Sequence, residues 1–314
     1  MKYYMAPMEG ITGYVYRNAY AAHFHDIDTY VAPFIVPQRQ REIKQSELRD
    51  IFPENNKEIR LIPQLLTNDA EDFICTQKEF AQYGYEELNL NLGCPSGTVT
   101  AKGKGSGFLD EPMKLDRFLD KVCSAAAGSI SIKTRLGTSD PEEIFDLMTI
   151  YNRYPLTKII LHPRTQQEFY MGTPHRDLFF DAAKMSRIPI CYNGDVSSRA
   201  DLKELEQGAP KLEHIMIGRG ILRDPWLVQR LKGGEGMPNK AGLLSFHDMI
   251  YEGYRQLMSG ERNTLFRMKE LWSYMGDMFV DSQKYWKKIK KSEKCRDYEA
   301  AVQGLFQDLP LKTV

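Results

Sequence analysis

The sequence has no long apolar segment and no excess of charge of either sign. None of its apolar runs approaches the ~20 residues needed to cross a bilayer, and the N-terminal segment MKYYMAPMEG lacks the apolar core of a signal peptide. We therefore expect a cytoplasmic protein with no membrane partner. Lysine plus arginine and aspartate plus glutamate both number 42, so a nucleic-acid partner would have to be recognised through a local basic cluster rather than through net charge.

The five cysteines are scattered along the chain, and no two of them have the CxxC spacing of zinc sites and redox motifs. We therefore expect neither a disulfide framework nor a metal site, and any functional cysteine must act alone. Cys75, Cys123 and Cys295 lie in helical patterns and Cys191 lies in a strand pattern, so these four are predicted to be packing residues. Cys94 differs from them because it directly follows a predicted strand.

Hydrophobic residues make up 42% of the chain and charged residues 27%, which is typical of a globular protein with a large core. Segments with apolar residues at helical spacing begin at Ala70, Pro112 and Pro141 and lie between short apolar runs. This alternation predicts a parallel sheet, and eight units in ~220 residues favour a closed (β/α)₈ TIM barrel of the α/β class over an open doubly wound sheet. The eight predicted strands are YYMA at Tyr3, TYVA at Thr29, RLIPQL at Arg60, ELNLNL at Glu87, SISIKT at Ser129, KIILH at Lys158, PICYN at Pro189 and HIMIG at His214.

The last third of the chain has a different pattern. After Leu231 the segment KGGEGMPNKAG is rich in glycine and polar residues, as linkers are. Beyond it SFHDMIYEGYRQLM, NTLFRMKELWSYMGDMF and CRDYEAAVQGLF have helical patterns, with Trp272 and Tyr274 as predicted core residues. We predict a barrel domain over residues 1–231, a linker over 232–242 and a small helical domain over 243–314.

Polar residues follow nearly every predicted strand. The carboxyl ends of barrel strands meet at one mouth, so these residues should converge there. They are residues 7–10 (PMEG), Gln64, Asn89, Asn91, residues 93–95 (GCP), Lys133, Arg135, His162, Arg164, residues 193–195 (NGD) and residues 218–220 (GRG).

The last two of these segments follow the seventh and eighth strands, where barrels commonly hold a phosphate. Their glycines would let backbone N–H groups approach the anion, and the guanidinium of Arg219 can pair with two phosphate oxygens. Glycines at strand ends can also serve only to form tight turns. The occurrence of both segments in register favours a phosphate site.

Lys133 lies in a strand pattern in which it faces away from Ile130 and Ile132, so it should point into the mouth of the barrel. A cation there could stabilise negative charge on a reduced flavin, or form a Schiff base with a carbonyl substrate. The structural alternative is a lysine paired with a carboxylate of the barrel. His162 ends the next strand, and it has either a role in the site or a purely structural one.

Cys94 stands at the start of a loop with several glycines and two lysines, Lys102 and Lys104. A thiol at the end of a strand can act as a nucleophile or as a proton donor. The glycines predict that the loop over residues 96–109 is mobile and orders over a substrate as a lid.

Taken in order, these residues resemble the tRNA-dihydrouridine synthase family of FMN-dependent barrel enzymes. The similarity covers nearly the whole chain, and seven motifs in barrel order make it specific. The chain departs from the family at Gly13, where many members carry aspartate, and we expect a changed local contact there. The motifs are APMEGIT at Ala6, PQLL with Gln64, LNLNLGCPS from Leu88, KTRLG at Lys133, HPRT at His162, NGD at Asn193 and IGRG at Ile217.

The resemblance implies an enzyme that reduces the C5–C6 double bond of specific uridines in tRNA, with FMN as cofactor and NADPH or NADH as hydride donor. It implies that Cys94 is the proton donor. Pro7, Met8 and Glu9 would lie against the flavin, Gln64, Lys133 and His162 would contact its ring system, and Asn193, Gly194, Asp195, Gly218 and Arg219 would hold the phosphate end.

A basic cluster near the C-terminus offers a contact for RNA. Seven basic residues and one acid lie between Lys284 and Arg296, with Tyr285 and Trp286 among them. We expect them to contact phosphates, although a solvated helix face would have the same composition. The predicted RNA-binding residues are Lys284, Lys287, Lys288, Lys290, Lys291, Lys102 and Lys104, and we expect the protein to act as a monomer.

Three other functions are compatible with parts of the sequence. A flavin-dependent dehydrogenase of a free pyrimidine, of the dihydroorotate type, would use the same barrel but would not need the basic helical domain. A Schiff-base aldolase would use Lys133 without flavin. An RNA-binding protein with an inactive barrel would have no reason to keep a thiol, a lysine and a histidine together at the mouth.

Overall fold

The computed structural model describes residues 1–37 and 43–313 of the chain. Residues 38–42 of the predicted barrel domain, and residue 314 at the end of the predicted helical domain, lie outside the described residues. Within the described part, no helix combines the length and apolar character needed to cross a membrane.

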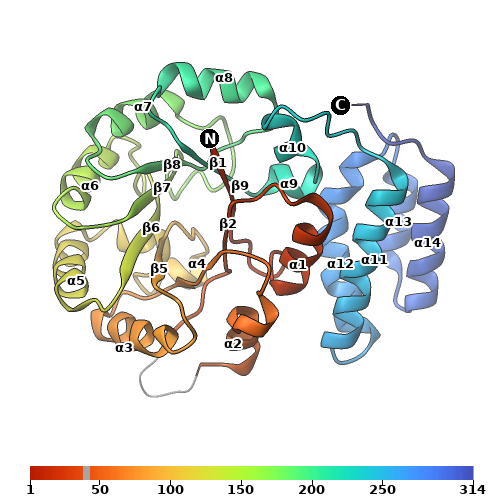
Figure 1. Cartoon of the computed structure of the whole chain (residues 1–314), viewed down its shortest axis with the longest axis horizontal. Helices are drawn as coiled ribbons and strands as arrows, with labels where there is room; N and C mark the ends of the chain where they lie inside the picture. Colours follow the sequence, from red (N-terminus) through yellow and green to blue (C-terminus); the bar gives the residue numbers. More distant parts are fainter. Residues whose placement is uncertain (38–42, 314) are drawn as a thin grey trace. The chain divides into compact units, whose positions relative to one another are not determined.

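A sheet of nine parallel strands forms the centre of the fold (Figure 1). The order of strands in the sheet is β3-β2-β1-β9-β8-β7-β6-β5-β4. Strands that are consecutive in sequence are neighbours, except β3 and β4 at the two edges, and the first strand pairs with the last. The strands are β1 (Lys2–Met5), β2 (Thr29–Val31), β3 (Leu61–Ile62), β4 (Gln64–Leu65), β5 (Glu87–Leu92), β6 (Ser129–Arg135), β7 (Lys158–His162), β8 (Ile190–Tyr192) and β9 (His214–Ile217).

The predicted TIM barrel is confirmed, with one difference in the third strand. The segment RLIPQL forms two short strands, β3 and β4, because Pro63 between them has no N–H to donate to a neighbouring strand. Ile35, which follows β2, pairs with Leu65, donates its N–H to Gln64 O at 2.8 Å and accepts from Leu66 N at 2.8 Å. These bonds nearly close the barrel across the break.

Helices on the outside of the barrel alternate with the strands (Figure 1). Neighbouring helices from α5 to α8 pack against one another, as do α3 and α5. The Asp69 carboxylate caps α3 by accepting from Glu71 N at 2.8 Å and Asp72 N at 3.1 Å, which satisfies two amides of its first turn. The helices of this unit are α2 (Gln45–Ile51), α3 (Ala70–Ala81), α4 (Gly97–Thr100), α5 (Pro112–Ala125), α6 (Glu143–Tyr151), α7 (Arg176–Met185) and α8 (Arg199–Gly208).

Apolar side chains from six of the strands fill part of the barrel. Alternate residues of a strand point to the same side, and the strands of a closed barrel share one interior. The buried cluster consists of Tyr4, Ala6, Val31, Ile62, Ile160, Cys191 and Met216. It gives the polar residues at the strand ends a packed, water-poor base.

The chain packs as two compact units, and their boundaries differ from the predicted domains. The barrel unit comprises Met1–Pro7 and Asp28–Ile217, and the helical unit comprises Met8–Ile27 and Gly218–Val314. The helical unit therefore takes in α1 (Tyr14–Phe24), α9 (Arg219–Arg223) and α10 (Leu227–Leu231), which the prediction placed in the barrel domain. Helix α11 (Lys240–Leu257) begins inside the predicted linker.

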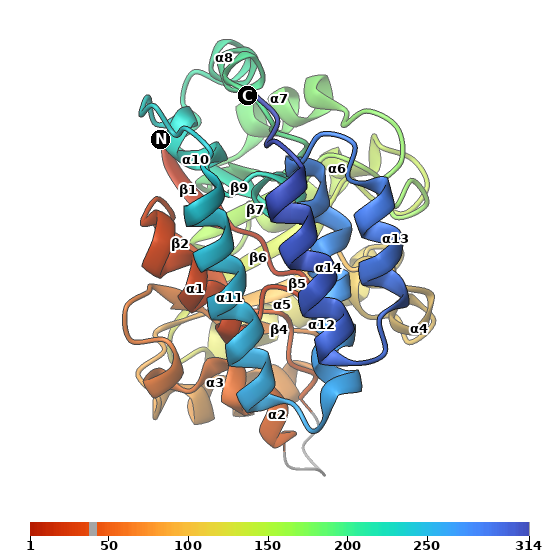
Figure 2. The ribbon, with the colours of Figure 1, turned by 90° about the vertical axis from the view of Figure 1, so that its right-hand side faces the viewer.

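In the helical unit, α11, α12 (Glu261–Met275), α13 (Gln283–Lys291) and α14 (Cys295–Asp308) run alongside one another (Figure 2). Helix α13 was not among the three predicted here and coincides with the basic cluster. The prediction that Trp272 is a core residue is confirmed, since only 1% of it is exposed, whereas Tyr274 is only partly buried.

A buried hydrogen-bond triad joins three helices of this unit. The Tyr298 hydroxyl accepts from Trp272 Nε1 at 2.7 Å and lies 2.6 Å from His247 Nε2. His247 Nδ1 is 2.8 Å from the Asp248 carboxylate, which can only accept, so Nδ1 carries a proton, and Nε2 shares a hydrogen bond with the tyrosine. All three rings are buried, so each polar atom depends on its partner.

Replacing Tyr298 by phenylalanine should destabilise the helical unit. The substitution leaves the Trp272 N–H and His247 Nε2 buried without a partner, at about 1–3 kcal/mol each, so we expect the free energy of unfolding to fall by at least about 2 kcal/mol. Urea denaturation followed by tryptophan fluorescence measures it. Tyr274→Phe on α12 is the control and should change the value by less than about 0.5 kcal/mol. Equal midpoints for Tyr298→Phe and the wild type would show that the triad contributes nothing.

Candidate active site

The backbone of Cys94 is held on both sides where it follows β5. The Asn91 side-chain oxygen accepts from Gly93 N at 3.0 Å and from Cys94 N at 2.9 Å. The Cys94 carbonyl in turn accepts from Ser106 N at 3.1 Å and from the Ser106 hydroxyl at 2.9 Å. Cys94 is half-buried, so the residue has a fixed backbone position without being sealed in the core.

A chain of side-chain amides connects this cysteine to the barrel interior. Asn91 donates through Nδ2 to Gln64 Oε1 at 2.8 Å, and Gln64 donates through Nε2 to Asn89 Oδ1 at 2.8 Å. Asn89 donates through Nδ2 to the Ser131 hydroxyl at 2.9 Å. Each bond fixes the orientation of the next amide, so β4, β5 and β6 together determine where the loop of Cys94 begins.

The loop after Cys94 is folded rather than extended. It forms α4 and the 3₁₀ helix η2 (Gly105–Phe108), and Ser106 and Phe108 are buried. Gly105 has φ +58°, and a Cβ there would come within 2.7 Å of the Cys94 carbonyl oxygen. Glycine is required at this position by the close packing against Cys94, which gives a physical reason for it other than the mobility expected from the sequence.

Lys102 and Lys104 differ in their surroundings on this loop. Lys102 is exposed and lines an open groove of about 620 Å³ together with Lys114 and Arg117. Lys104 is half-buried and precedes η2.

Lys133 faces the barrel interior, as its strand pattern predicts. It lies on β6 between Asn91 of β5 and Ile160 of β7. Desolvation by burial, reinforced by the Arg135 charge, lowers the pKa of Lys133 from its ordinary 10.5 to about 8, and the nearby thiols of Cys191 and Cys94 oppose this shift. Among the carboxylates of the described residues, none forms an ion pair with Lys133. Within the described part of the chain, the structural alternative therefore finds no carboxylate partner for Lys133.

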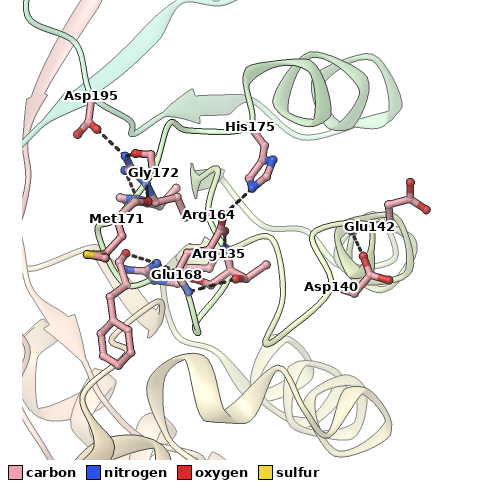
Figure 3. A network of polar contacts seen from close by, with 12 residues as sticks. Arg135, Asp140, Glu142, Arg164, Glu168, Met171, Gly172, His175 and Asp195 are labelled. Atoms are coloured by element: carbon pink, nitrogen blue, oxygen red, sulfur yellow. Dashed lines mark hydrogen bonds and ion pairs between the residues drawn. The ribbon is translucent and has the colours of Figure 1, made fainter.

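His162 is buried at the end of β7 and contacts a buried arginine. Its Nε2 lies 3.2 Å from a terminal nitrogen of Arg164, and since a guanidinium only donates, Nε2 accepts. The rings of His162 and Tyr170 form a T-shaped pair, with centroids 5.9 Å apart and an interplanar angle of 77°. Arg164 is fully buried and pairs with the half-exposed carboxylate of Asp195 at 2.6 Å (Figure 3).

Arg135 and Arg164 hold the loop that follows β7. Arg135, 1% exposed, donates to the carbonyls of Thr165 at 2.8 Å and Phe169 at 2.7 Å, and through Nε to Gly93 O at 2.8 Å. Arg164 donates to the carbonyls of Met171 at 2.9 Å and Gly172 at 2.6 Å (Figure 3). The sequence placed both arginines at the mouth without assigning them a role. The sequence feature that could have indicated a role for them is their position at the ends of consecutive strands.

The segment after β8 ties two strand ends together. Asn193 donates through Nδ2 to Met216 O at 2.9 Å, and a Cβ on Gly194 would come within 2.2 Å of the Tyr192 hydroxyl oxygen. A carboxylate repels phosphate, but the charge of Asp195 is balanced by Arg164. The negative charge of Asp195 therefore does not by itself exclude an anion beside this segment.

Four of the predicted cofactor residues belong to the helical unit, directly after β1 and β9. Met8 and exposed Glu9 follow Pro7 in a turn in which Met8 N donates to the Thr12 hydroxyl at 2.8 Å. Gly218 and Arg219 continue from β9 into α9.

The lysines predicted to bind RNA are exposed on α13. This helix buries Tyr285 and Ile289 and leaves Lys284, Lys287, Lys288, Lys290 and Lys291 in solvent. Lys284 and Lys288 lie over the Tyr285 ring, at 5.8 and 5.1 Å from its centroid.

The remaining cysteines agree with their predicted packing role except one. Cys191 lies in the barrel cluster, and burial raises its pKa to about 12. Cys123 and Cys295 are partly buried, and burial raises both pKa values, that of Cys123 to about 11. Cys75 is exposed on α3, so the prediction was wrong there: the helical pattern did not reveal which face it occupies.

Comparisons with known proteins agree with this geometry. Residues 4–310 match the family model described as "Dihydrouridine synthase (Dus)". The chain is 29% identical over 244 residues to the "tRNA-dihydrouridine(16) synthase" of Cupriavidus necator, covering 73% of each chain. It is 26% identical over 264 residues to the "Probable tRNA-dihydrouridine synthase" of Staphylococcus epidermidis, covering 80% of this chain and 78% of the relative.

Solved structures show the same fold at low sequence identity. Morphinone reductase has a TM-score of 0.52 at 12% identity, with 74% of this chain and 86% of the other chain covered. The old yellow enzyme from Trypanosoma cruzi has a TM-score of 0.53 at 9% identity, with 74% and 88% covered. Because the family match spans nearly the whole chain, the protein belongs to the dihydrouridine synthase family.

Proposed function

We propose that this protein reduces the C5–C6 double bond of specific uridines in tRNA, with FMN as cofactor and NADPH or NADH as the source of hydride. One observation carries the proposal. In a chain of the dihydrouridine synthase family, the thiol of Cys94 and the ammonium of Lys133, which has no carboxylate partner among the described residues, lie near each other in one barrel.

The residues of the barrel fit a flavin. A partly buried cation suits an electron-rich ring, and Lys133 provides one that has no carboxylate partner in the part of the chain that the structure describes. Gln64 uses one N–H and one lone pair within the protein, which leaves a second donor and a second lone pair for a ring edge. Pro7, Met8, Glu9 and His162 would complete the ring contacts.

The phosphate end of FMN would lie at the segments after β8 and β9. Asn193 and Gly194 form a close-packed turn, and Asp195 is neutralised by Arg164. Gly218 and Arg219 would add a backbone amide and a guanidinium, which pairs well with phosphate oxygens.

The chemistry requires one hydride and one proton. Bound FMN, once reduced, supplies the hydride to one carbon of the uracil double bond. Cys94 donates the proton from Sγ to the neighbouring carbon, from a backbone position fixed by Asn91 and Ser106. The Lys133 ammonium stabilises the negative charge that develops on the uracil before this proton arrives.

The basic surface favours a polynucleotide over a free pyrimidine as substrate. Five exposed lysines on one short helix would have no use in a dehydrogenase of dihydroorotate type, whereas they suit the phosphates of RNA. Lys102, in a groove with Lys114 and Arg117, and Lys104 would add contacts near the barrel mouth.

Cys94→Ala should separate the two half-reactions. FMN binding and its reduction by NADPH should remain at the wild-type level, because the thiol takes no part in either. Reduction of tRNA by the pre-reduced enzyme should slow by about 10²- to 10⁴-fold, the usual contribution of general acid catalysis. Stopped-flow absorbance of the flavin measures both steps, and Cys75→Ala on the surface of α3 is the control. A wild-type rate would remove Cys94 from the mechanism, and loss of FMN would make it structural.

The depressed pKa of Lys133 predicts a pH window in stability. Between about 8 and 10.5 the unfolded chain holds a proton that the folded chain has lost, so wild-type stability relative to Lys133→Met should rise with pH across this range. Below about pH 8, the lysine is charged in both the folded and the unfolded chain, so the folded wild type bears the full cost of desolvating that charge. The total rise should be on the order of 3 kcal/mol. Urea unfolding of both proteins from about pH 7 to about pH 10.5 tests it, and a pH-independent difference would contradict it.

Neutralising lysines of α13 should weaken tRNA binding in a salt-dependent way. A plot of log binding constant against log salt concentration has a negative slope. Lys287→Gln and Lys290→Gln should each make this slope less steep by about 1, the value for one lost phosphate contact. Lys203→Gln on α8, where Asp201, Glu204 and Glu206 surround the lysine in sequence, is the control and should leave the slope unchanged. Filter binding at several salt concentrations measures the slopes, and unchanged slopes for the α13 variants would assign these lysines to a solvated face.

A further inference from the structure

Three consecutive large hydrophobic residues lie exposed on the loop after β7. Phe169, Tyr170 and Met171 are 49%, 52% and 75% exposed, and we call them the apolar tip. The other exposed large hydrophobic residues of the described chain stand alone in sequence. Isolated exposed hydrophobic residues are ordinary, but a contiguous group of them usually marks an interaction surface.

The apolar tip is held rigidly in this exposed position. Arg135 and Arg164 bind the carbonyls of Phe169, Met171 and Gly172, so the loop cannot fold inward without leaving buried guanidinium groups unpaired (Figure 3). The Glu168 carboxylate accepts from Thr165 N at 2.6 Å and lies 2.7 Å from His175 Nε2.

Phe169 adopts a strained backbone conformation within the tip. Its φ is +53°, in the left-handed region that costs a residue with a Cβ about 1–2 kcal/mol. Such strain persists where the surroundings impose it, and it is concentrated at functional sites. A phenylalanine that is both strained and half-exposed contributes little to the stability of the fold.

The tip adjoins the residues assigned to the reaction. Arg135 binds the carbonyls of Phe169 and Gly93, the residue before Cys94. The Tyr170 ring meets His162 edge-on, and the Arg135 guanidinium lies 5.2 Å from its centroid. Tyr170 is thereby engaged with the site, whereas no ring contact is recorded for Phe169 within the described residues.

We propose that Phe169 and Met171 form a stacking platform for a base that neighbours the target uridine in the RNA. This inference rests on the proposed function. A uridine can reach Cys94 only after it leaves the base stack, which exposes the face of the adjacent base to water. An aromatic ring and a polarisable thioether, fixed beside the site, would cover that face and compensate part of the unstacking cost.

The test uses the full-length, FMN-loaded protein with Phe169→Gly and Met171→Ala. Phe169→Gly removes the ring and also relieves the left-handed strain, so its melting temperature should not fall. Its kcat/KM for tRNA should drop by about 5- to 100-fold, the range for losing one stacked base, while flavin reduction by NADPH stays at the wild-type rate. Met171→Ala should show a smaller loss in the same direction.

Two controls make the result specific. Phe169→Trp keeps an aromatic face and should retain most of the activity on tRNA. Met113→Ala on α5 removes a methionine that is 75% exposed, like Met171, and should have no effect.

Wild-type kcat/KM in Phe169→Gly would overturn the platform. So would a change in the mass of the protein in solution without a change in tRNA kinetics, because the tip would then bind a second copy of the chain. If the wild-type protein itself does not reduce tRNA, the proposed function is wrong. If the wild type is active and Phe169→Gly is equally active, only the stacking platform is wrong.

Discussion

The arrangement of the site depends on the hydrogen bonds of two buried guanidinium groups. Burying a cation is costly unless its donors are satisfied. Arg135 donates to three backbone carbonyls of surrounding loops, and Arg164 donates to two carbonyls and contacts the side chains of Asp195 and His162. The loop after β7 must therefore follow the positions of these groups. The residue before Cys94 is held by the same means, so one interaction places both the thiol and the exposed hydrophobic side chains at the barrel mouth.

The amide chain from Ser131 to Cys94 works in the same way from the other side. Each amide in it has both a donor and an acceptor engaged, so the barrel can hold polar side chains in its interior without leaving them unsatisfied. Lys133 is different, because burial disfavours its charge and its ammonium meets no carboxylate among residues 1–37 and 43–313. In the proposed reaction, this cation would stabilise the developing negative charge and the nearby thiol of Cys94 would deliver the proton.

Much of the fold was predictable from the sequence because strands and helices have different hydrophobic periods. The two-residue alternation placed Lys133 on the interior face of β6, and strand ends located Cys94 and His162. The roles of Arg135 and Arg164 were not predictable, because their partners are backbone carbonyls whose positions depend on tertiary structure. The same holds for Gly105, which the sequence indicated as a source of mobility and which the fold uses for close packing.

If this chain makes dihydrouridine in tRNA, the product can be detected in the RNA itself. The measurement is mass spectrometry of nucleosides and fragments from unmodified tRNA, incubated with the FMN-loaded protein and NADPH. Uridine at a defined position should gain two hydrogen atoms, while free uridine under the same conditions should not react. A protein that binds FMN and is reduced by NADPH, yet leaves every uridine of tRNA unchanged, would contradict the proposed function.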